Sequence, residues 1–389
     1  MKSEWKRYAL GDITELVIDY RGKTPKKLGG DWSHRGYRAL SAKNIKTGHI
    51  VQPDTIRFVD EDMYRKWMKD EIRRGDILIT SEAPFGQILF WDSDEKIVLS
   101  QRLFGVRIKK TFDPKFIYYY MTTSDFQGEM AGRATGTTVI GLRQPELMKC
   151  EVCCPDIERQ KRIASILSSI DEKIELNDKI NENLEQQAQA IYQEWFGNIN
   201  MEKKQGMLSD ICTYSKDRVS VSELDISTYF STENMLPGKA GATEASNLPT
   251  TAQTTACHVG DTLISNIRPY FKKIVYCHEE CGCSTDVLCF VPAHPKYSAY
   301  LYSTLYADRF FDFMVAGSKG TKMPRGDKQQ IMTYPVTLPT DTELERFNSV
   351  AGPILMQIQN NRNENKRLSA LRDTVLPKLM NGEIDIDGI

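Results

Sequence analysis

The feature that most constrains this chain is an internal repeat with an offset of 184 or 185 residues. GDILITSEAPFGQILFW, starting at Gly75, aligns with GDTLISNIRPYFKKIVY, starting at Gly260, and ATGTT around Gly136 aligns with SKGTK around Gly320. Each copy reaches a boundary marked by proline, at Pro155 and Pro339, and continues into a long charged segment. Because a long-period repeat determines the architecture to be inferred, the chain is predicted to contain two similar globular parts, each followed by a helix.

Within each globular part, the sequence predicts an α+β fold with an irregular, loop-rich sheet. DILIT, QILFW, KIVLS and LFGVRI are short apolar stretches broken by Gly, Pro and Asp, which is typical of strands. FDPKFIYYYMTTSDFQGEMA is typical of a helix. The predicted division is residues 1–155 and 201–340 for the globular domains, and residues 156–200 and 341–389 for the helices.

The two predicted helices carry matching apolar stripes. The first stripe runs at steps of three and four through Ile163, Leu167, Ile170, Ile174, Leu184, Ala188, Ile191 and Trp195. The second runs through Ile354, Ile358, Leu368, Val375 and Leu379. A single helix cannot bury such a stripe alone, so the two helices are expected to pack on each other. Pro377 is expected to end or kink the second helix just before Leu379.

Asparagines interrupt both stripes at equivalent places, Asn177 and Asn181 in the first and Asn361 and Asn365 in the second. Residues 157–196 would form a rod of roughly 60 Å with Asn177 near its middle. If the helices pack antiparallel about a pseudo-twofold axis, both pairs meet in one central polar layer, where buried Asn fixes register. The alternative is that these asparagines face water on two unrelated amphipathic helices.

Charge and composition narrow the class of protein. Residues 1–150 carry 26 basic and 20 acidic side chains, although the whole chain has a formal net charge of −1. In DYRGKTPKK, Arg21, Lys23, Lys26 and Lys27 could face a strip of phosphates, or form a solvated basic loop. Nine irregularly spaced cysteines suggest reduced thiols. No apolar run approaches the ~18 residues of a membrane span, and MKSEWKRYAL lacks the core of a signal peptide, so a cytoplasmic protein is expected.

Over nearly its whole length the chain resembles the type I restriction–modification specificity subunit family. The resemblance rests on EWKRYALGDI with RGKTP, RRGDILIT, VLSQRLFGVRI, GTT followed by GLRQPEL, PDIERQKRIASILSSIDEKI, and the closing LPKLMNGEI. Each string alone is only moderately specific, but their order and duplication make the combined match strong. In the second half, TELERF departs from the acidic-glutamine pair formed by Glu158 and Gln160 in the first, which weakens the expectation of docking at that helix start.

The resemblance implies a non-catalytic, sequence-reading subunit. Two target-recognition domains would each read one half of a bipartite DNA site, and the two helices would set their spacing. Two adenine-N6 methyltransferase subunits would dock on the helices and supply the methyl donor, so no cofactor is assigned to this chain, and two restriction–translocase subunits could join. TSEAPF and SNIRPY differ chemically, so the two half-sites should differ.

Candidate DNA contacts are polar or basic residues on loops, because such side chains read base edges and hold phosphates. Most polar loop residues of any protein only meet water, so about half of the set is expected to touch DNA. In the first domain the set is Arg21, Lys23, Thr24, Ser41, Lys43, Asn44, Ser81, Glu82, Gln101, Arg102, Arg133, Thr137 and Arg143. In the second it is Ser265, Asn266, Arg268, Lys272, Lys319, Thr321, Lys322 and Arg325.

Other functions were weighed against DNA reading. Cys277, His278, Cys281 and Cys283, near Cys257, invite a zinc interpretation, but the spacing is not a paired CxxC pattern, and packed thiols are the default. The chain shows no phosphate loop, methyltransferase tetrapeptide or nucleophile elbow. A nuclease built from dispersed acids is the less favoured alternative. A coiled-coil adaptor that binds proteins is the other, and the neutral second domain favours it.

Overall fold

The computed structural model describes residues 5–136, 139–197 and 204–386. The chain divides into two compact units, residues 1–174 with 366–389 (unit 1) and residues 175–365 (unit 2). Each unit combines a globular part with segments of two long helices. We call the globular parts head 1 (residues 6–154) and head 2 (residues 205–337). No helix in the described ranges is both long and apolar enough to cross a membrane.

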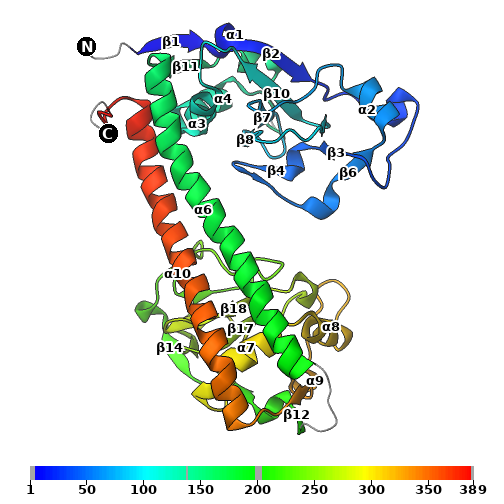
Figure 1. The fold of residues 1–389 in the computed structure, drawn as a ribbon, viewed down its shortest axis with the longest axis vertical. Coiled ribbons are helices and arrows are strands. Elements are labelled where there is room, and N and C mark those ends of the chain that lie inside the picture. The colour runs from blue at the N-terminus through cyan, green and yellow to red at the C-terminus, as the bar shows by residue number, and fades with distance from the viewer. Residues whose placement is uncertain (1–4, 137–138, 198–203, 387–389) are drawn as a thin grey trace. The chain divides into compact units, whose positions relative to one another are not determined.

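Head 1 is built on three sheets and a small hairpin (Figure 1). The pair is β1 (Lys6–Ala9) with β11 (Glu151–Cys154), and the four-stranded sheet has the order β2 (Thr14–Asp19), β10 (Leu103–Ile108), β7 (Ile77–Thr80), β8 (Ile88–Phe90). The third sheet is β6 (Arg57–Val59), β3 (Tyr37–Leu40), β9 (Val98–Leu99), and the hairpin is β4 (Ile45–Lys46) with β5 (His49–Ile50). The strands predicted at 76–80, 87–91, 96–100 and 103–108 are confirmed as β7, β8, β9 and β10.

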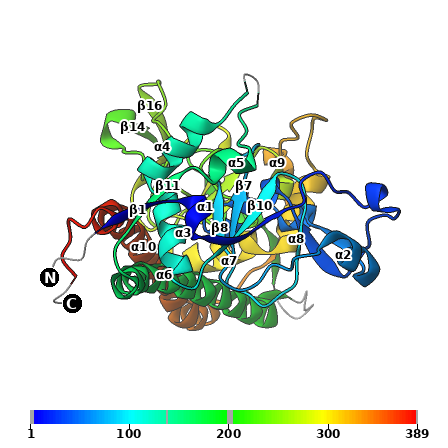
Figure 2. The ribbon, with the colours of Figure 1, turned by 90° about the horizontal axis from the view of Figure 1, so that it is seen from above.

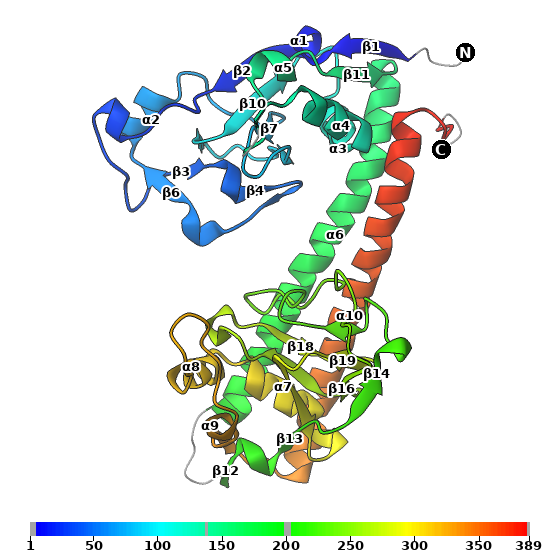
Figure 3. The ribbon, with the colours of Figure 1, turned by 180° about the vertical axis from the view of Figure 1, so that it is seen from behind.

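Head 2 repeats this plan (Figure 3). The pair is β12 (Gln205–Met207) with β21 (Pro335–Thr337), and the four-stranded sheet has the order β13 (Cys212–Tyr214), β20 (Val287–Pro292), β17 (Thr262–Ser265), β18 (Ile274–Tyr276). The third sheet has the order β14 (Arg218–Ser220), β16 (Gln253–Cys257), β19 (Cys281–Cys283), β15 (Tyr229–Phe230). In both heads a parallel strand pair occurs in this third sheet, β3 with β9 and β15 with β19. The two heads therefore share a topology, and they differ mainly in the segments between the shared strands.

Short helices cover the sheets. Those of head 1 are α1 (Leu10–Ile13), α2 (Glu61–Trp67), α3 (Pro114–Thr122), α4 (Ser124–Arg133) and α5 (Gln144–Leu147), with 3-10 turns at Lys26–Leu28, Ala42–Asn44 and Pro53–Thr55. Those of head 2 are α7 (Ser298–Tyr306), α8 (Asp308–Ala316) and α9 (Lys328–Met332), with 3-10 turns at Leu208–Asp210, Val221–Glu223, Pro269–Phe271 and Pro295–Tyr297. Helix α3 lies against β8, as Figure 2 shows from above.

The single helix predicted over 112–131 is two helices, α3 and α4, with a break at Thr123. Thr123 has an extended backbone, and its side chain accepts a hydrogen bond from the backbone N–H of Phe126 (3.4 Å). A threonine in this position satisfies one of the free N–H groups at a helix start, so it begins a new helix rather than continuing the old one. The apolar pattern continues through the break and could not reveal it.

The two long helices are α6 (Ile157–Tyr192), extended by a π-helical turn over Gln193–Gly197, and α10 (Asp341–Met380). Both contribute to the cores of both units. In unit 1, Leu167 and Leu379 join the core around Phe104 and Phe116. In unit 2, Tyr192 and Phe347 join the core around Phe290. Burial of these apolar side chains is what attaches each head to the helices.

Proline 377 does not end α10, contrary to expectation, because the helix continues to Met380. Leu379 and Met380, 2% and 4% exposed, pack into the core of unit 1, and the N–H of Asn381 donates to the carbonyl of Pro377 (3.0 Å). A proline removes one helical hydrogen bond and clashes with the preceding turn. Packing of the last turn into a core offsets that cost.

The four seam asparagines meet in unit 2, where they join α6 to α10. Asn177 donates its amide to the side-chain oxygen of Asn365 (2.8 Å), and Asn361 donates to that of Asn181 (2.8 Å). Asn177, Asn181 and Asn361 are buried. Since residue numbers rise on one helix while they fall on the other, the helices run antiparallel here.

A tyrosine–acid–arginine triple in each unit joins the head to both long helices. In unit 1, Asp171 of α6 accepts from the Tyr119 hydroxyl (2.7 Å) and from Arg372 of α10 (2.9 Å). In unit 2, Glu185 of α6 accepts from the Tyr306 hydroxyl (2.7 Å) and from Arg362 of α10 (2.9 Å). Burial raises the pKa of Tyr119 and that of Glu185.

The asparagine layer makes a prediction for stability. Asn181→Ala should lower the free energy of unfolding by about 1–3 kcal/mol, because the buried Asn361 amide loses its acceptor. Replacing both Asn181 and Asn361 with Leu should recover most of that loss, since no unpaired amide remains. Urea unfolding followed by circular dichroism measures both effects. Asn363→Ala, on the exposed side of α10, is the control, and an equal loss from the control would contradict the prediction.

Candidate nucleic-acid interface

Three loops meet at one junction in head 1, and several of the predicted contact residues lie there. The backbone N–H of Ser81, after β7, donates to the carbonyl of Arg102, before β10 (2.9 Å). The N–H of Leu142 donates to the carbonyl of Ser81 (3.0 Å), which adds the loop around residues 135–142. Arg102 Nε lies 3.0 Å from Glu82 Oε1. The junction therefore presents a half-exposed carboxylate–guanidinium pair.

A pocket of about 180 Å³ beside this junction brings together three more predicted residues, Ser41, Lys43 and Gln101. It is also lined by Trp32 and Arg57, which sequence reasoning missed. The Arg57 guanidinium lies over the Trp32 ring, 5.1 Å from its centroid. Lys43 and Arg57 give this pocket a basic character. We call it pocket 1.

The basic loop of head 1 is held more firmly than a free strip of cations would be. Arg21 forms two 2.8 Å hydrogen bonds to the carboxylate of Asp19, and Lys23 Nζ donates to the carbonyl of Trp67 (2.7 Å). Burial lowers the pKa of Lys23. Thr24 accepts from the backbone N–H of Lys27 (3.3 Å). Arg21 and Lys23 would have to exchange these partners to reach phosphates.

The junction recurs in head 2 with the same backbone hydrogen bonds. The N–H of Asn266 donates to the carbonyl of Asp286 (2.8 Å), and the N–H of Gly326 donates to the carbonyl of Asn266 (3.3 Å). Arg325 NH2 lies 2.9 Å from Asp286 Oδ1. The predicted residues Ser265, Asn266 and Arg325 thus meet at one place, with Asp286 as a partner that the sequence analysis omitted.

The remaining predicted residues are spread around these junctions. Lys272 pairs with Asp308 (2.7 Å), Lys319 with Asp327 (2.5 Å), and Arg133 with Glu129 on α4 (2.9 Å). Arg143, Thr321 and Lys322 are exposed, Arg268 begins the turn at Pro269–Phe271, and Thr137 lies outside the described residues. Arg143 and Lys322 are therefore exposed cations near the junction loops.

Four predicted residues have buried side chains. Asn44, Ser81 and Ser265 are 1–2% exposed, and Asn266 is 7% exposed. The Asn44 amide donates to Thr55 Oγ1 (3.0 Å), and Ser265 Oγ donates to the carbonyl of Ile267 (3.2 Å). In this structure the hydrogen bonds of Asn44 and Ser265 shape the loops that carry exposed neighbours.

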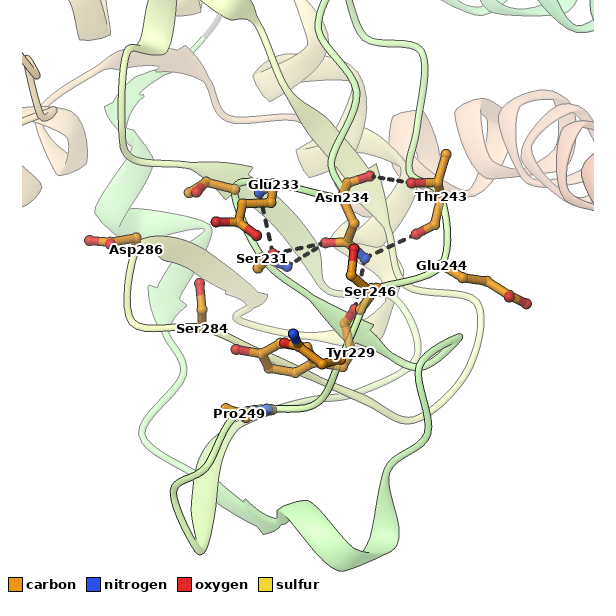
Figure 4. A pocket seen from close by; sticks show the side chains of 13 residues that line it. Tyr229, Ser231, Glu233, Asn234, Thr243, Glu244, Ser246, Pro249, Ser284 and Asp286 are labelled. Atoms are coloured by element: carbon orange, nitrogen blue, oxygen red, sulfur yellow. Dashed lines mark hydrogen bonds between the residues drawn. The ribbon is translucent and has the colours of Figure 1, made fainter. Parts of the chain in front are cut away.

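Head 2 has a polar pocket of about 330 Å³ that sequence reasoning missed (Figure 4). We call it pocket 2. Its lining includes Ser231, Glu233, Asn234 and Asp286. Ser231 donates its backbone N–H to Asn234 Oδ1 (2.6 Å), as Ser41 does to Asn44 Oδ1 in head 1 (3.1 Å). The signal was present as LSAKNI and FSTENM, but the serines are 190 residues apart instead of 184, so a search at the main offset passes over it.

The cysteines of head 2 pack together as part of its core. Cys257, Cys277, Cys281, Cys283 and Cys289 are buried and share a cluster with Leu263 and Val287, and the Cys277 and Cys281 sulfurs lie 3.6 Å apart. Within the part of the chain that the structure describes, no group of three or more His, Cys, Asp or Glu side chains could hold a metal ion. The arrangement is that of packed thiols.

Histidine 278 makes a prediction for pH dependence. Burial lowers its pKa to about 4, so it is neutral in the folded chain at neutral pH. An unfolded histidine binds a proton at about pH 6.5. Stability should therefore be complete above about pH 6.5 and fall by roughly 1–3 kcal/mol as the pH drops toward 4. Urea midpoints between pH 7 and 4.5 should fall less for His278→Gln than for His49→Gln, an exposed control. Identical slopes for both variants would contradict this account.

Comparison with known proteins identifies the class of domain. The family model for the type I restriction modification DNA specificity domain matches residues 2–186. The MjaVIII specificity subunit of Methanocaldococcus jannaschii is 29% identical over 201 residues, 48% of this chain and 47% of that protein. The HindI specificity subunit of Haemophilus influenzae is 27% identical over 50% of this chain and 41% of that protein. The chain thus spans about half the length of these two curated relatives.

Two further matches extend over most of the chain. The MjaIX specificity subunit of M. jannaschii is 22% identical over 374 residues, 81% of this chain and 78% of that protein. The crystal structure of a type I restriction–modification S subunit from M. genitalium has a TM-score of 0.58, with 16% identity over 97% of this chain and 96% of that one. The latter likeness shows a shared fold. The chain belongs to the type I restriction–modification specificity subunit family.

Proposed function

We propose that this chain is the DNA sequence-reading subunit of a type I restriction–modification complex and has no catalytic centre of its own. The observation that carries the proposal is the repeated loop junction, in which the same backbone hydrogen bonds present different side chains in each head. Residues 1–155 and 201–340 would be the two target-recognition domains, and residues 156–200 and 341–389 the spacer helices. Since the exposed residues of the two junctions differ, the site read would be bipartite and asymmetric.

The proposal includes the partners of the long helices. Leu176, Ile180, Met356 and Leu371 are apolar side chains that remain at least 38% exposed on α6 and α10. Exposed apolar side chains on a helix pair that is already formed suit docking of further helices. Two adenine-N6 methyltransferase subunits would dock here, and two restriction–translocase subunits would complete a restricting complex. An antiparallel spacer with pseudo-twofold symmetry would then relate the heads.

The first prediction concerns methylation. Cells that express this chain with its adenine methyltransferase partner should carry N6-methyladenine at one bipartite asymmetric motif, and deletion of this chain should abolish the mark. The reason is that the methyltransferase depends on this subunit to find its target. Methylation-sensitive sequencing measures the motif. Unchanged methylation in the deletion strain, with expression and assembly verified in the parent, would contradict the proposal and favour the protein-binding adaptor.

The second prediction concerns salt. Each phosphate contact that is lost should reduce the slope of log affinity against log salt by about 0.9. Arg143→Gln and Lys322→Gln, exposed cations beside the two junctions, should each lower the slope for duplex DNA binding by the assembled complex. Lys179→Gln, on the exposed face of α6, is the control. Equal slopes for all variants would place phosphate binding elsewhere, and affinity independent of salt would remove the electrostatic basis of the proposal.

A further inference from the structure

Pocket 1 and pocket 2 occupy the same place in their respective heads. Each lies beside the parallel strand pair of the third sheet, β3 with β9 and β15 with β19. In head 1 the N–H of Ser100 donates to the carbonyl of Leu40 (2.8 Å), and in head 2 the N–H of Ser284 donates to the carbonyl of Phe230 (2.9 Å). Ser100 lines pocket 1 and Ser284 lines pocket 2. The two pockets are therefore equivalent positions on one duplicated framework.

The charges in the two pockets are opposite. Lys43 in LSAKNI corresponds to Glu233 in FSTENM, and Arg102 in SQR corresponds to Asp286 in STD. Lys43 and Glu233 each line their pocket and are exposed. Asp286 lines pocket 2, and in Figure 4 its carboxylate points away from the hydrogen-bonded network around Asn234. Two cations in head 1 are thus replaced by two carboxylates in head 2.

A carboxylate on a DNA-reading surface requires a reason, because it repels phosphates. Asp286 is partly neutralised by Arg325 at 2.9 Å, yet its side chain remains 39% exposed, and a carboxylate has about four acceptor sites. Among the described residues no ion pair involves the Glu233 side chain. Both acids are thus able to accept hydrogen bonds from a ligand that carries donors.

We propose that pocket 1 and pocket 2 are the specificity-determining sites of the two heads, with Glu233 and Asp286 accepting hydrogen bonds from a cytosine amino group and Lys43 and Arg102 donating to a guanine. This deepens and rests on the proposed DNA-reading function. In the major groove, guanine presents two acceptors and cytosine one amino donor. Adenine presents a donor beside an acceptor, which suits Asn or Gln better than an acceptor-only carboxylate.

The test uses the assembled complex and a library of random-sequence duplexes, from which bound DNA is selected and sequenced. Asp286→Asn and Glu233→Gln should each reduce the preference for cytosine at one position of one half-site by roughly 5- to 150-fold, the range of a good base contact. The amide replacements should also admit adenine at that position, because an amide both donates and accepts. The other half-site should be unchanged in both variants.

Controls separate folding from reading. Asp312→Asn removes an exposed acid from α8 of the same unit and should leave all preferences unchanged. Thermal melting checks that each variant folds. If Asp286→Asn disturbs the loop held by Arg325, Glu233→Gln still tests the pocket, since its side chain joins no ion pair among the described residues.

The outcomes are distinct. A wild-type complex that selects no sequence overturns the proposed function itself. A wild-type complex that selects a bipartite motif, while both amide variants keep every base preference within about twofold, overturns the pocket assignment and leaves the function standing. A changed preference in both half-sites from one variant would also overturn the assignment, because each pocket would then not act on its own head's target.

Discussion

The pairing of α6 with α10 through buried asparagines is the constraint on which the rest of unit 2 depends. Neither helix can bury its apolar stripe alone, and apolar side chains by themselves allow several registers. The amide of Asn177 reaches Asn365, and that of Asn361 reaches Asn181, only in one alignment. A slip by one turn would leave buried amides unpaired, at a cost of about 1–3 kcal/mol each. The polar layer therefore trades some stability for a single register.

That register determines which head residues meet the helices. Glu185 receives Tyr306 from head 2 and Arg362 from α10, and in unit 1 Asp171 receives Tyr119 and Arg372 in the same way. A buried acid is tolerated only when hydrogen-bond donors surround it. Each triple is satisfied only when the head, α6 and α10 are in place together. Fold duplication has thus kept the means of attachment while the residues that supply it differ.

The sequence predicted the duplication, the main strands and the seam, because all three are periodic or repeated and so leave a pattern. It failed where one local interaction overrides the pattern. Thr123 splits a helix by capping a new one, and core packing of Leu379 carries α10 past Pro377. Candidate contacts were chosen by residue type, which cannot distinguish Lys43, exposed at a pocket, from Asn44, buried beside it. Asp286 was missed because carboxylates are not usual on phosphate-binding surfaces.

The two heads show how one framework can read two sequences. Backbone hydrogen bonds hold the loop junction in the same form in both, since they involve no side chain that evolution would have to preserve. Exposed side chains on such a junction can change sign without disturbing the fold, because partly exposed ion pairs contribute little to stability. Arg102 pairs with Glu82 in one head and Asp286 with Arg325 in the other, so each junction balances its own charge. Reversal of charge at equivalent positions makes identical half-sites chemically unfavourable, because a group that donates to guanine cannot accept from cytosine. An asymmetric target is then a consequence of the divergence between the heads.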